Sequence, residues 1–110
     1  MTALAGRECR PYPKGTPALS LEQATELLRE IPGWSINSSS SSISREFRFK
    51  DFHQTMAFVN ALAWIAHQTD HHPDLEVGYN RCNVTFSTHS IAGLSDNDFI
   101  CAARINSLGE

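Results

Sequence analysis

The first chemical feature of the sequence is the segment HQTDHHPD, residues 67–74, which holds three histidines and two aspartates in eight positions. The chain has five histidines, and four of them lie between His67 and His89. An imidazole exchanges protons near neutral pH and is also a common metal ligand. The cluster therefore indicates proton transfer, metal binding or the capping of a helix end.

Metal binding is the first of these alternatives. His67 and His71 are four residues apart, which brings two imidazoles together on a helix, and with His89 they could form a three-histidine zinc site. The glutamate that accompanies such histidines in metalloproteases is absent, because position 68 is Gln. The adjacent His71 and His72 cannot easily face one ion unless the backbone turns between them. We therefore predict a site without a metal ion.

Proton transfer is the interpretation that uses the whole cluster. Two or three imidazoles around one pocket can protonate a leaving group and accept a proton elsewhere on the same substrate. Asp70, Asp74 and Asp98 could orient these imidazoles. The sequence contains neither a GxSxG motif nor a phosphate-binding glycine loop, so it does not support serine catalysis or nucleotide chemistry. A helix end, which favours a cation by about 0.3–1 kcal/mol, would explain one histidine but not the others.

The length of 110 residues suits one domain, and the formal net charge of −3 argues against non-specific nucleic-acid binding. No apolar run reaches the ~18 residues of a membrane-spanning helix. The first residues lack the charged start and apolar stretch of a secretory signal. Cys9, Cys82 and Cys101 form no CxxC motif, so we expect reduced thiols, the latter two in the core. We expect a cytoplasmic protein that binds neither nucleic acid directly nor membrane.

Seven elements are expected to position the histidines, in the order helix, strand, strand, helix, strand, strand, helix. A capping box at Ser20 begins the first helix, and Pro32-Gly33 ends it. The other elements are expected at Trp34–Asn37, Ile43–Phe49, Asp51 to about Asp70, Leu75–Tyr79, Cys82–His89 and after Ser95. This order predicts an α+β fold with a four-stranded antiparallel sheet and helices packed on one face. Residues 1–19, rich in proline and glycine, are predicted as an irregular N-terminal arm, and residues 20–110 as a single domain.

The long helix expected after Asp51 has two features of interest. Its apolar side chains spread over about half the circumference, wider than the stripe of an ordinary surface helix, so we expect a second subunit to cover part of them. On another flank, spacings of 7, 4, 3 and 4 residues align His53, Asn60, Trp64, His67 and His71. A flat apolar ring among polar groups suits the wall of a small-molecule pocket. A solvated flank with one amphipathic tryptophan would show the same spacing.

The spacing of His67, His71-His72-Pro73, Tyr79, His89 and Asp98 resembles the signature of the pterin-4a-carbinolamine dehydratase family. The intervening gaps of three, five, nine and eight residues all fit. The resemblance extends from about residue 20 to the end of the chain. Three departures from relatives concern this region. Many relatives have Glu where this chain has His67, and some animal relatives have Trp where it has Leu75 and Cys where it has Ile91.

The resemblance implies a hydro-lyase, a 4a-hydroxytetrahydrobiopterin dehydratase, that converts 4a-hydroxytetrahydropterin to quinonoid dihydropterin in tetrahydropterin recycling. It implies no metal or organic cofactor, and a homodimer or homotetramer. His71 and His89 would act as general acids, and His72 would bind and orient the pterin as a third catalytic residue. The predicted substrate-binding residues are His72, His67, Asp70, Trp64 and Asp98.

A non-catalytic role is the alternative that the resemblance leaves open. Animal relatives also serve as dimerisation cofactors of a transcription factor, and similar proteins accompany Rubisco as assembly factors in some bacteria. A pure scaffold has no need for His71, His72 and His89 together. Asp98 also stands at the third position of a helix cap that begins at Ser95, so a purely structural role is a second possibility for it.

Overall fold

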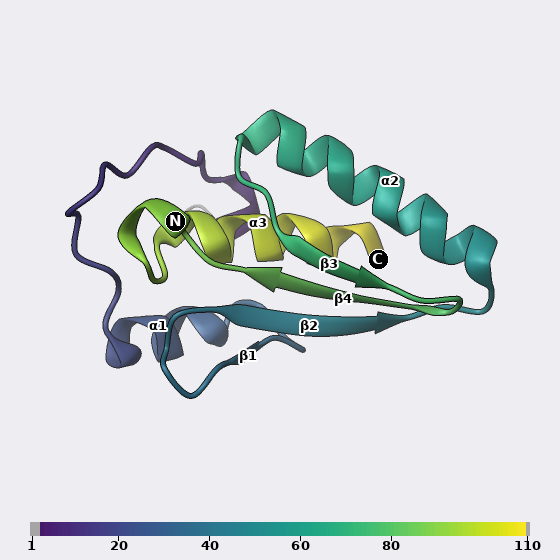
Figure 1. Ribbon diagram of the computed structural model, residues 1–110, viewed down its shortest axis with the longest axis horizontal. Coiled ribbons are helices and arrows are strands. Elements are labelled where there is room, and N and C mark those ends of the chain that lie inside the picture. Colours follow the sequence, from purple (N-terminus) through teal and green to yellow (C-terminus); the bar gives the residue numbers. More distant parts are fainter. Residues whose placement is uncertain (1–2, 110) are drawn as a thin grey trace.

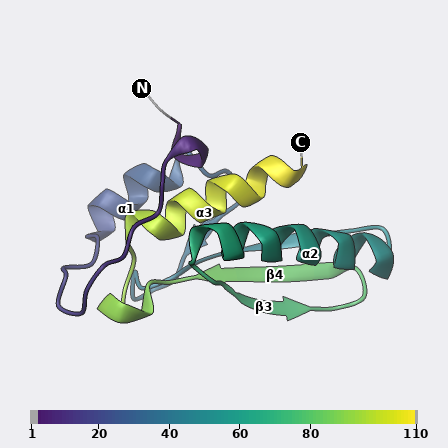
Figure 2. The same cartoon turned by 90° about the horizontal axis from the view of Figure 1, so that it is seen from above.

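The computed structural model describes residues 3–109; Met1 and Thr2 of the predicted arm and Glu110 of the predicted domain lie outside the described residues. A four-stranded antiparallel sheet carries three α-helices on one face, as Figures 1 and 2 show. The elements are α1 (Leu21–Leu28), β1 (Ser35–Ile36), β2 (Ile43–Arg48), α2 (Phe52–Thr69), β3 (Asp74–Val77), β4 (Arg81–Phe86) and α3 (Asp96–Asn106). The predicted fold class and order of elements are confirmed.

Three short 3-10 helices join these elements: η1 (Leu4–Gly6), η2 (His89–Ile91) and η3 (Ser107–Gly109). Within residues 3–109, no helix is both long enough and apolar enough to cross a membrane.

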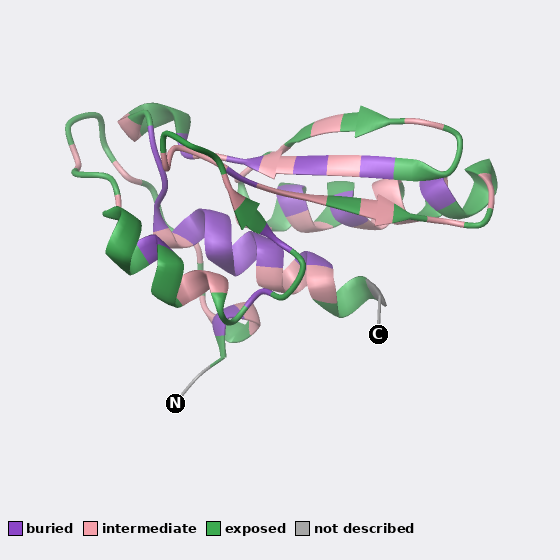
Figure 3. Cartoon of the chain, turned by 90° about the horizontal axis from the view of Figure 1, so that it is seen from below, coloured by how far each residue is buried: buried purple, intermediate pink, exposed green. Residues whose placement is uncertain are grey.

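The sheet has the strand order β1-β2-β4-β3, so β2 and β4 form its centre. Cys82, Val84 and Phe86 of β4 are buried under the helices, while the residues between them are only partly buried (Figure 3). This alternation follows from the two-residue period of a strand. One face of the sheet therefore forms the core with the helices, and no helix of residues 3–109 covers the other face (Figure 2).

The helix boundaries follow from side-chain caps. Ser20 and Ser95 each form a complete capping box, and the Asp51 carboxylate accepts a hydrogen bond from the backbone of Gln54 at 2.9 Å. At the other end of α2, Asp70 adopts a left-handed conformation with φ 53°. The predicted stop before Pro73 is confirmed.

The last strand ends earlier than predicted. The apolar alternation extends to Thr88, but β4 stops at Phe86, because Thr88 pairs with Gly93 across the turn formed by η2. His89 therefore begins a 3-10 helix and does not lie on a strand. This turn brings the loop after β4 toward the start of α3.

Arg45, the charged residue on the apolar face of β2, has specific partners. Its guanidinium lies 4.4 Å from the centre of the Phe47 ring and donates to Asn106 at 2.8 Å and to the Pro32 carbonyl at 3.0 Å. Asn106 also accepts from the indole of Trp34 at 2.8 Å. These contacts join β2 to the end of α3. They stabilise the Arg45 guanidinium through hydrogen bonds and the Phe47 ring, without a carboxylate partner.

Residues 3–19 lack strands and α-helices; the segment crosses α3 before it turns toward α1 (Figure 2). Leu4 is buried, and Arg104 of α3 donates to the carbonyls of Ala5 and Arg7 at 3.1 and 2.6 Å. Arg7 in turn forms an ion pair with Asp96 at 2.9 Å. The arm is thereby attached to α3 by side-chain contacts, and this attachment places residues 9–12 beside the histidine cluster.

Candidate functional site

The strongest polar contact of the histidine cluster joins His71 to Asp98. The Nε2 atom of His71 lies 2.6 Å from Oδ1 of Asp98, whose side chain is 0% exposed. The His71 side chain is 11% exposed, so one edge of the ring still reaches solvent. A buried carboxylate that contacts an imidazole in this way fixes the orientation of the ring and the nitrogen that carries the proton.

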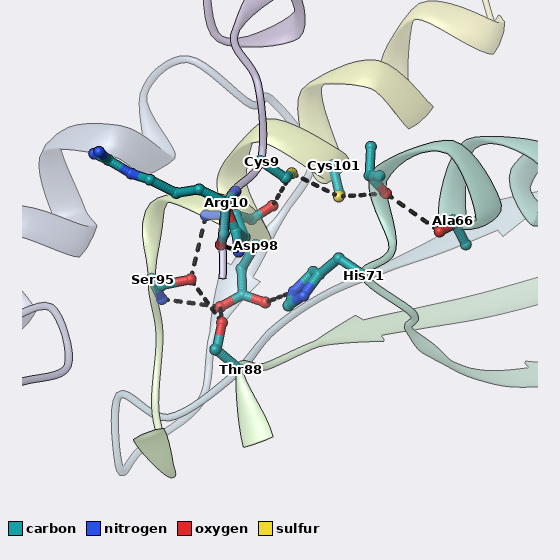
Figure 4. A network of polar contacts seen from close by, with 10 residues as sticks. Cys9, Arg10, Ala66, His71, Thr88, Ser95, Asp98 and Cys101 are labelled. Carbon is teal, nitrogen blue, oxygen red and sulfur yellow. Dashed lines mark hydrogen bonds and ion pairs between the residues drawn. The ribbon is translucent and has the colours of Figure 1, made fainter. Parts of the chain in front are cut away.

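The other Asp98 oxygen accepts two hydrogen bonds (Figure 4). Its Oδ2 atom accepts from the Thr88 hydroxyl at 2.8 Å and from the Ser95 backbone at 3.0 Å. Thr88 gives its only hydroxyl proton to Asp98, so the 2.7 Å contact between Thr88 and Ser95 requires Ser95 to donate. Each donor in this network has one acceptor. An ionised Asp98 carboxylate has no proton to donate, so in the His71 contact Nε2–H of the imidazole is the donor. Asp98 completes the cap of α3 at the same time.

Two further contacts set the plane of the His71 ring. The ring stacks on Phe86 of β4 with 5.7 Å between centroids and 7° between planes. The left-handed turn at Asp70 directs the chain back toward the sheet, and the His71 backbone donates to the Ala66 carbonyl at 3.3 Å. Within residues 3–109, Nδ1 of His71 has no hydrogen-bond partner. This nitrogen is available to exchange a proton with a bound molecule.

A cavity of about 480 Å³ lies against His71, within the range of small-molecule sites. Its lining comes from three parts of the chain: the arm, the end of α2 with the two residues after it, and the segment that runs from Thr88 into the first turn of α3. The lining residues are Cys9, Arg10, Pro11, Tyr12, Thr69, Asp70, His71, Thr88, Ser90 and Asn97. The site is therefore a concave surface with a fixed imidazole in its wall.

The predicted site residues divide into two groups. His71 and Asp70 line the cavity, and Asp98 lies behind His71. His72, His67, Trp64 and His89 are exposed and are not among the lining residues, although Thr88 and Ser90 on either side of His89 are. Trp64 and His67 contact each other, with 5.8 Å between ring centroids. The structure thus brings His71, Asp70 and Asp98 together and leaves the other four at the surface.

No three His, Cys, Asp or Glu side chains within residues 3–109 lie close enough together to hold a metal ion.

The arm contributes residues that the sequence did not indicate as part of the site. The Asn97 side chain pairs with the backbone of Arg10 in both directions, at 3.0 and 2.6 Å. The Ser90 hydroxyl donates to the Tyr12 carbonyl at 2.7 Å. Irregular segments rich in proline carry no periodicity, so nothing in the sequence pattern related residues 9–12 to His71.

The comparisons with known proteins agree on one family. The family model described as pterin 4 alpha carbinolamine dehydratase matches residues 17–108. A relative from Nitrosospira multiformis is 54% identical over 105 residues, which cover 96% of this chain and 91% of the relative. One from Stenotrophomonas maltophilia is 54% identical over 107 residues, covering 97% of this chain and 92% of the relative. Both carry a provisional name, pterin-4-alpha-carbinolamine dehydratase.

Solved structures give the same result. A Brucella melitensis protein described as a transcriptional coactivator/pterin dehydratase superposes with a TM-score of 0.81 at 34% identity, covering 86% of this chain and all of the other. A pterin dehydratase-like protein described as a RuBisCO assembly factor of the alpha-carboxysome gives a TM-score of 0.61 at 27% identity, covering 69% of this chain and 88% of the other.

Proposed function

Because the chain belongs to the pterin-4-alpha-carbinolamine dehydratase family, we propose that it removes water from a 4a-hydroxytetrahydropterin and releases quinonoid dihydropterin. The observation that supports this most strongly is the His71–Asp98 contact at the wall of a cavity. We propose the biopterin form as substrate, tetrahydropterin recycling as the context and the cytoplasm as the location.

The reaction needs one proton donor and one proton acceptor. The hydroxyl leaves C4a as water only after it gains a proton, while the N5 lone pair expels it and the N5 proton is lost. Imidazoles can supply both steps, and such help is worth about 10²–10⁴-fold, or ~3–5 kcal/mol of barrier. The reaction transfers no net electrons, so imidazole chemistry suffices without a metal or an organic cofactor.

In this proposal His71 gives its proton to the departing hydroxyl. Its Nε2 atom is engaged by Asp98, so Nδ1 is the atom that exchanges the proton. Since Asp98 is 0% exposed, we propose that it acts through His71 and orients the ring. His89 is proposed as the second general acid, because its neighbours Thr88 and Ser90 both line the cavity.

The remaining predicted residues are proposed as substrate contacts. Asp70 lines the cavity directly. His72 is adjacent to His71 and exposed, and we propose that it binds and orients the pterin. Trp64 and His67 form an exposed pair on α2, and we propose that they extend the binding surface beyond the cavity.

A non-catalytic scaffold is the second candidate. It is favoured by the two solved structures whose descriptions include a coactivator and an assembly factor. Such a role would use the surface of the fold and would not require the proton-exchanging position of His71.

An assay with chemically prepared pterin carbinolamine separates the two candidates. We expect the protein to accelerate the appearance of dihydropterin absorbance over the buffer rate. His71→Ala should reduce turnover by at least ~10²-fold, because the proton donor is lost. His53→Ala is the matched control: His53 is exposed near the start of α2 and does not line the cavity. It should leave turnover unchanged, and no acceleration by the wild-type protein would favour the scaffold.

A further inference from the structure

Two cysteines meet beside the proposed active site although 92 positions separate them in the sequence. The Sγ atom of Cys9, in the arm, lies 3.7 Å from the Sγ atom of Cys101, on α3 (Figure 4). The third cysteine, Cys82, is fully buried in β4. The chain therefore contains one thiol pair and one thiol held inside the core.

The two thiols of the pair differ in their access to solvent. Cys9 is half-buried and lines the cavity next to His71. It also lines a second cavity of about 370 Å³ near Arg7 and Asp96. Cys101 is 0% exposed, and its thiol donates to the Thr69 hydroxyl at 3.5 Å. A small oxidant in the cavity can therefore reach the Cys9 thiol directly. The Cys101 thiol has no access to solvent, and it can react with the oxidised Cys9 sulfur that it contacts.

The same contact makes the two thiols unequal as acids. The contact with the Cys101 sulfur, assisted by the nearby charges of His71 and Arg104 and opposed by burial, lowers the pKa of the Cys9 thiol to about 7. The contact with Cys9 and burial raise the pKa of Cys101. Burial alone raises the pKa of Cys82. Since the thiolate is the reactive form, Cys9 is the nucleophile of the pair.

We propose that Cys9 and Cys101 form a peroxide-sensitive modification site, in which Cys9 is oxidised first and Cys101 then closes a disulfide. In the first step the Cys9 thiolate attacks one oxygen of hydrogen peroxide, the O–O bond breaks, and sulfenic acid and hydroxide form. In the second step the Cys101 sulfur attacks the Cys9 sulfur and the S–O bond breaks. The Cys101 proton goes to the departing oxygen, which leaves as water. Two thiols lose two electrons, and one peroxide is reduced to two waters.

The geometry permits this closure with a small displacement. The sulfurs must approach by about 1.7 Å, from 3.7 Å to the ~2.05 Å of a disulfide. Cys101 is fixed on α3, but Cys9 belongs to a segment held by side-chain contacts and not by a strand or helix. Cys9 is therefore the partner that moves. The bond would tie the arm covalently to α3 at the edge of the cavity.

Oxidation of the full-length protein with a small excess of hydrogen peroxide tests the proposal. We expect the intact mass to fall by two hydrogen atoms and peptide mapping to give a linked Cys9–Cys101 pair, with Cys82 still free. In Cys101→Ser, Cys9 should remain as sulfenic acid and be trapped by dimedone. In Cys9→Ser, no linked pair should form and Cys101 should stay reduced.

If a variant fails to fold, the wild-type protein alone tests the proposal, because the oxidation of Cys9 and Cys101 can be compared with that of Cys82 in the same sample. A linked pair that contains Cys82, oxidation of Cys82 as fast as Cys9, or three free thiols after treatment would overturn the proposal. These readouts do not depend on dehydratase activity. A protein that forms the linked pair but does not dehydrate the carbinolamine would contradict the proposed function and leave this inference intact.

Discussion

At the scale of single residues, the site depends on one imidazole whose two nitrogens have different surroundings. Asp98 holds Nε2 of His71, and Phe86 holds the plane of the ring. Removing the negative charge of Asp98 while keeping its shape should change which nitrogen carries the proton. An asparagine can still accept from Thr88 and Ser95 through its oxygen, so its amide group would face His71 and present a donor to Nε2. The histidine would then carry its proton on Nδ1, and it could not form a charged pair.

Cys9 offers a separate test at this scale. Its pKa of about 7, lowered from 9.0, means that the reactive thiolate is half-formed near neutral pH. The alkylation rate of Cys9 by iodoacetamide should therefore rise with pH and reach half its maximum near pH 7, as followed by peptide mass spectrometry. The groups that face Cys9 and set this value are Cys101, His71, Arg104 and Asp98. A midpoint near that of an ordinary thiol would show that the Cys101 contact is absent in solution.

Part of the candidate site could be inferred from the sequence, and part could not. The signature spacing selected His71, and the structure brings His71 to Asp98 and Asp70. The contribution of Asn97, Arg10 and Tyr12 could not be inferred, because it depends on how an irregular segment crosses the start of α3. Likewise, the contact between Cys9 and Cys101 is a product of tertiary packing and has no signal in sequence spacing.

At the scale of elements, the cavity is formed where three segments meet, and only two of them were recognisable in advance. Helix caps and strand alternation are local signals, so α1, α2, α3 and the central strands were predicted close to their observed limits. The end of β4 was not predicted correctly, because it depends on the pairing of Thr88 with Gly93, which no local pattern indicates. The placement of the arm depends on contacts with α3 that are distant in sequence.

The attachment of the arm to α3 gives a prediction for substrate binding. Asn97→Ala removes both hydrogen bonds that hold the Arg10 backbone, so residues 9–12 should become looser. We expect the KM for the pterin to rise several-fold with kcat little changed, since His71 and Asp98 keep their contacts. Faster hydrogen exchange in residues 9–12 should accompany this change.

Asn60→Ala is the matched control for that experiment, because Asn60 is exposed on α2 and does not line the cavity. This variant should change neither the KM for the pterin nor the rate of hydrogen exchange in residues 9–12. If Asn97→Ala lowers kcat and leaves KM unchanged, the arm is not a wall of the binding site.

At the scale of the whole molecule, the chain leaves apolar surface uncovered. The exposed large apolar side chains are Leu21, Phe52, Trp64, Val77, Tyr79 and Leu108. Phe52 at the start of α2 stacks on Tyr79 with 6.5 Å between ring centroids, and Trp64 farther along α2 is 61% exposed. Phe52 and Tyr79 thus form an exposed aromatic pair, and exposed apolar groups of this kind can serve as an interface between subunits. The division into an arm at residues 1–19 and a domain at 20–110 stays a prediction.

We therefore propose that the protein is a homodimer or homotetramer. Sedimentation at micromolar concentration should give a mass that is two or four times the 12.2 kDa of one chain. Phe52→Glu should shift the distribution toward the monomer, because it places a charge on the exposed apolar surface. A wild-type protein that sediments as a 12.2 kDa species would contradict the proposed assembly.

The most direct test of the proposed mechanism is a double-mutant cycle on the dehydration rate, with His71→Ala, Asp98→Asn and both changes together. If Asp98 acts through His71, Asp98→Asn alone should slow kcat by about 10-fold or more, and the double variant should be no slower than His71→Ala. Circular dichroism should show the same fold in all three variants. Losses that add independently, or an Asp98→Asn variant with wild-type kcat, would contradict the claim that a carboxylate-held imidazole delivers the proton.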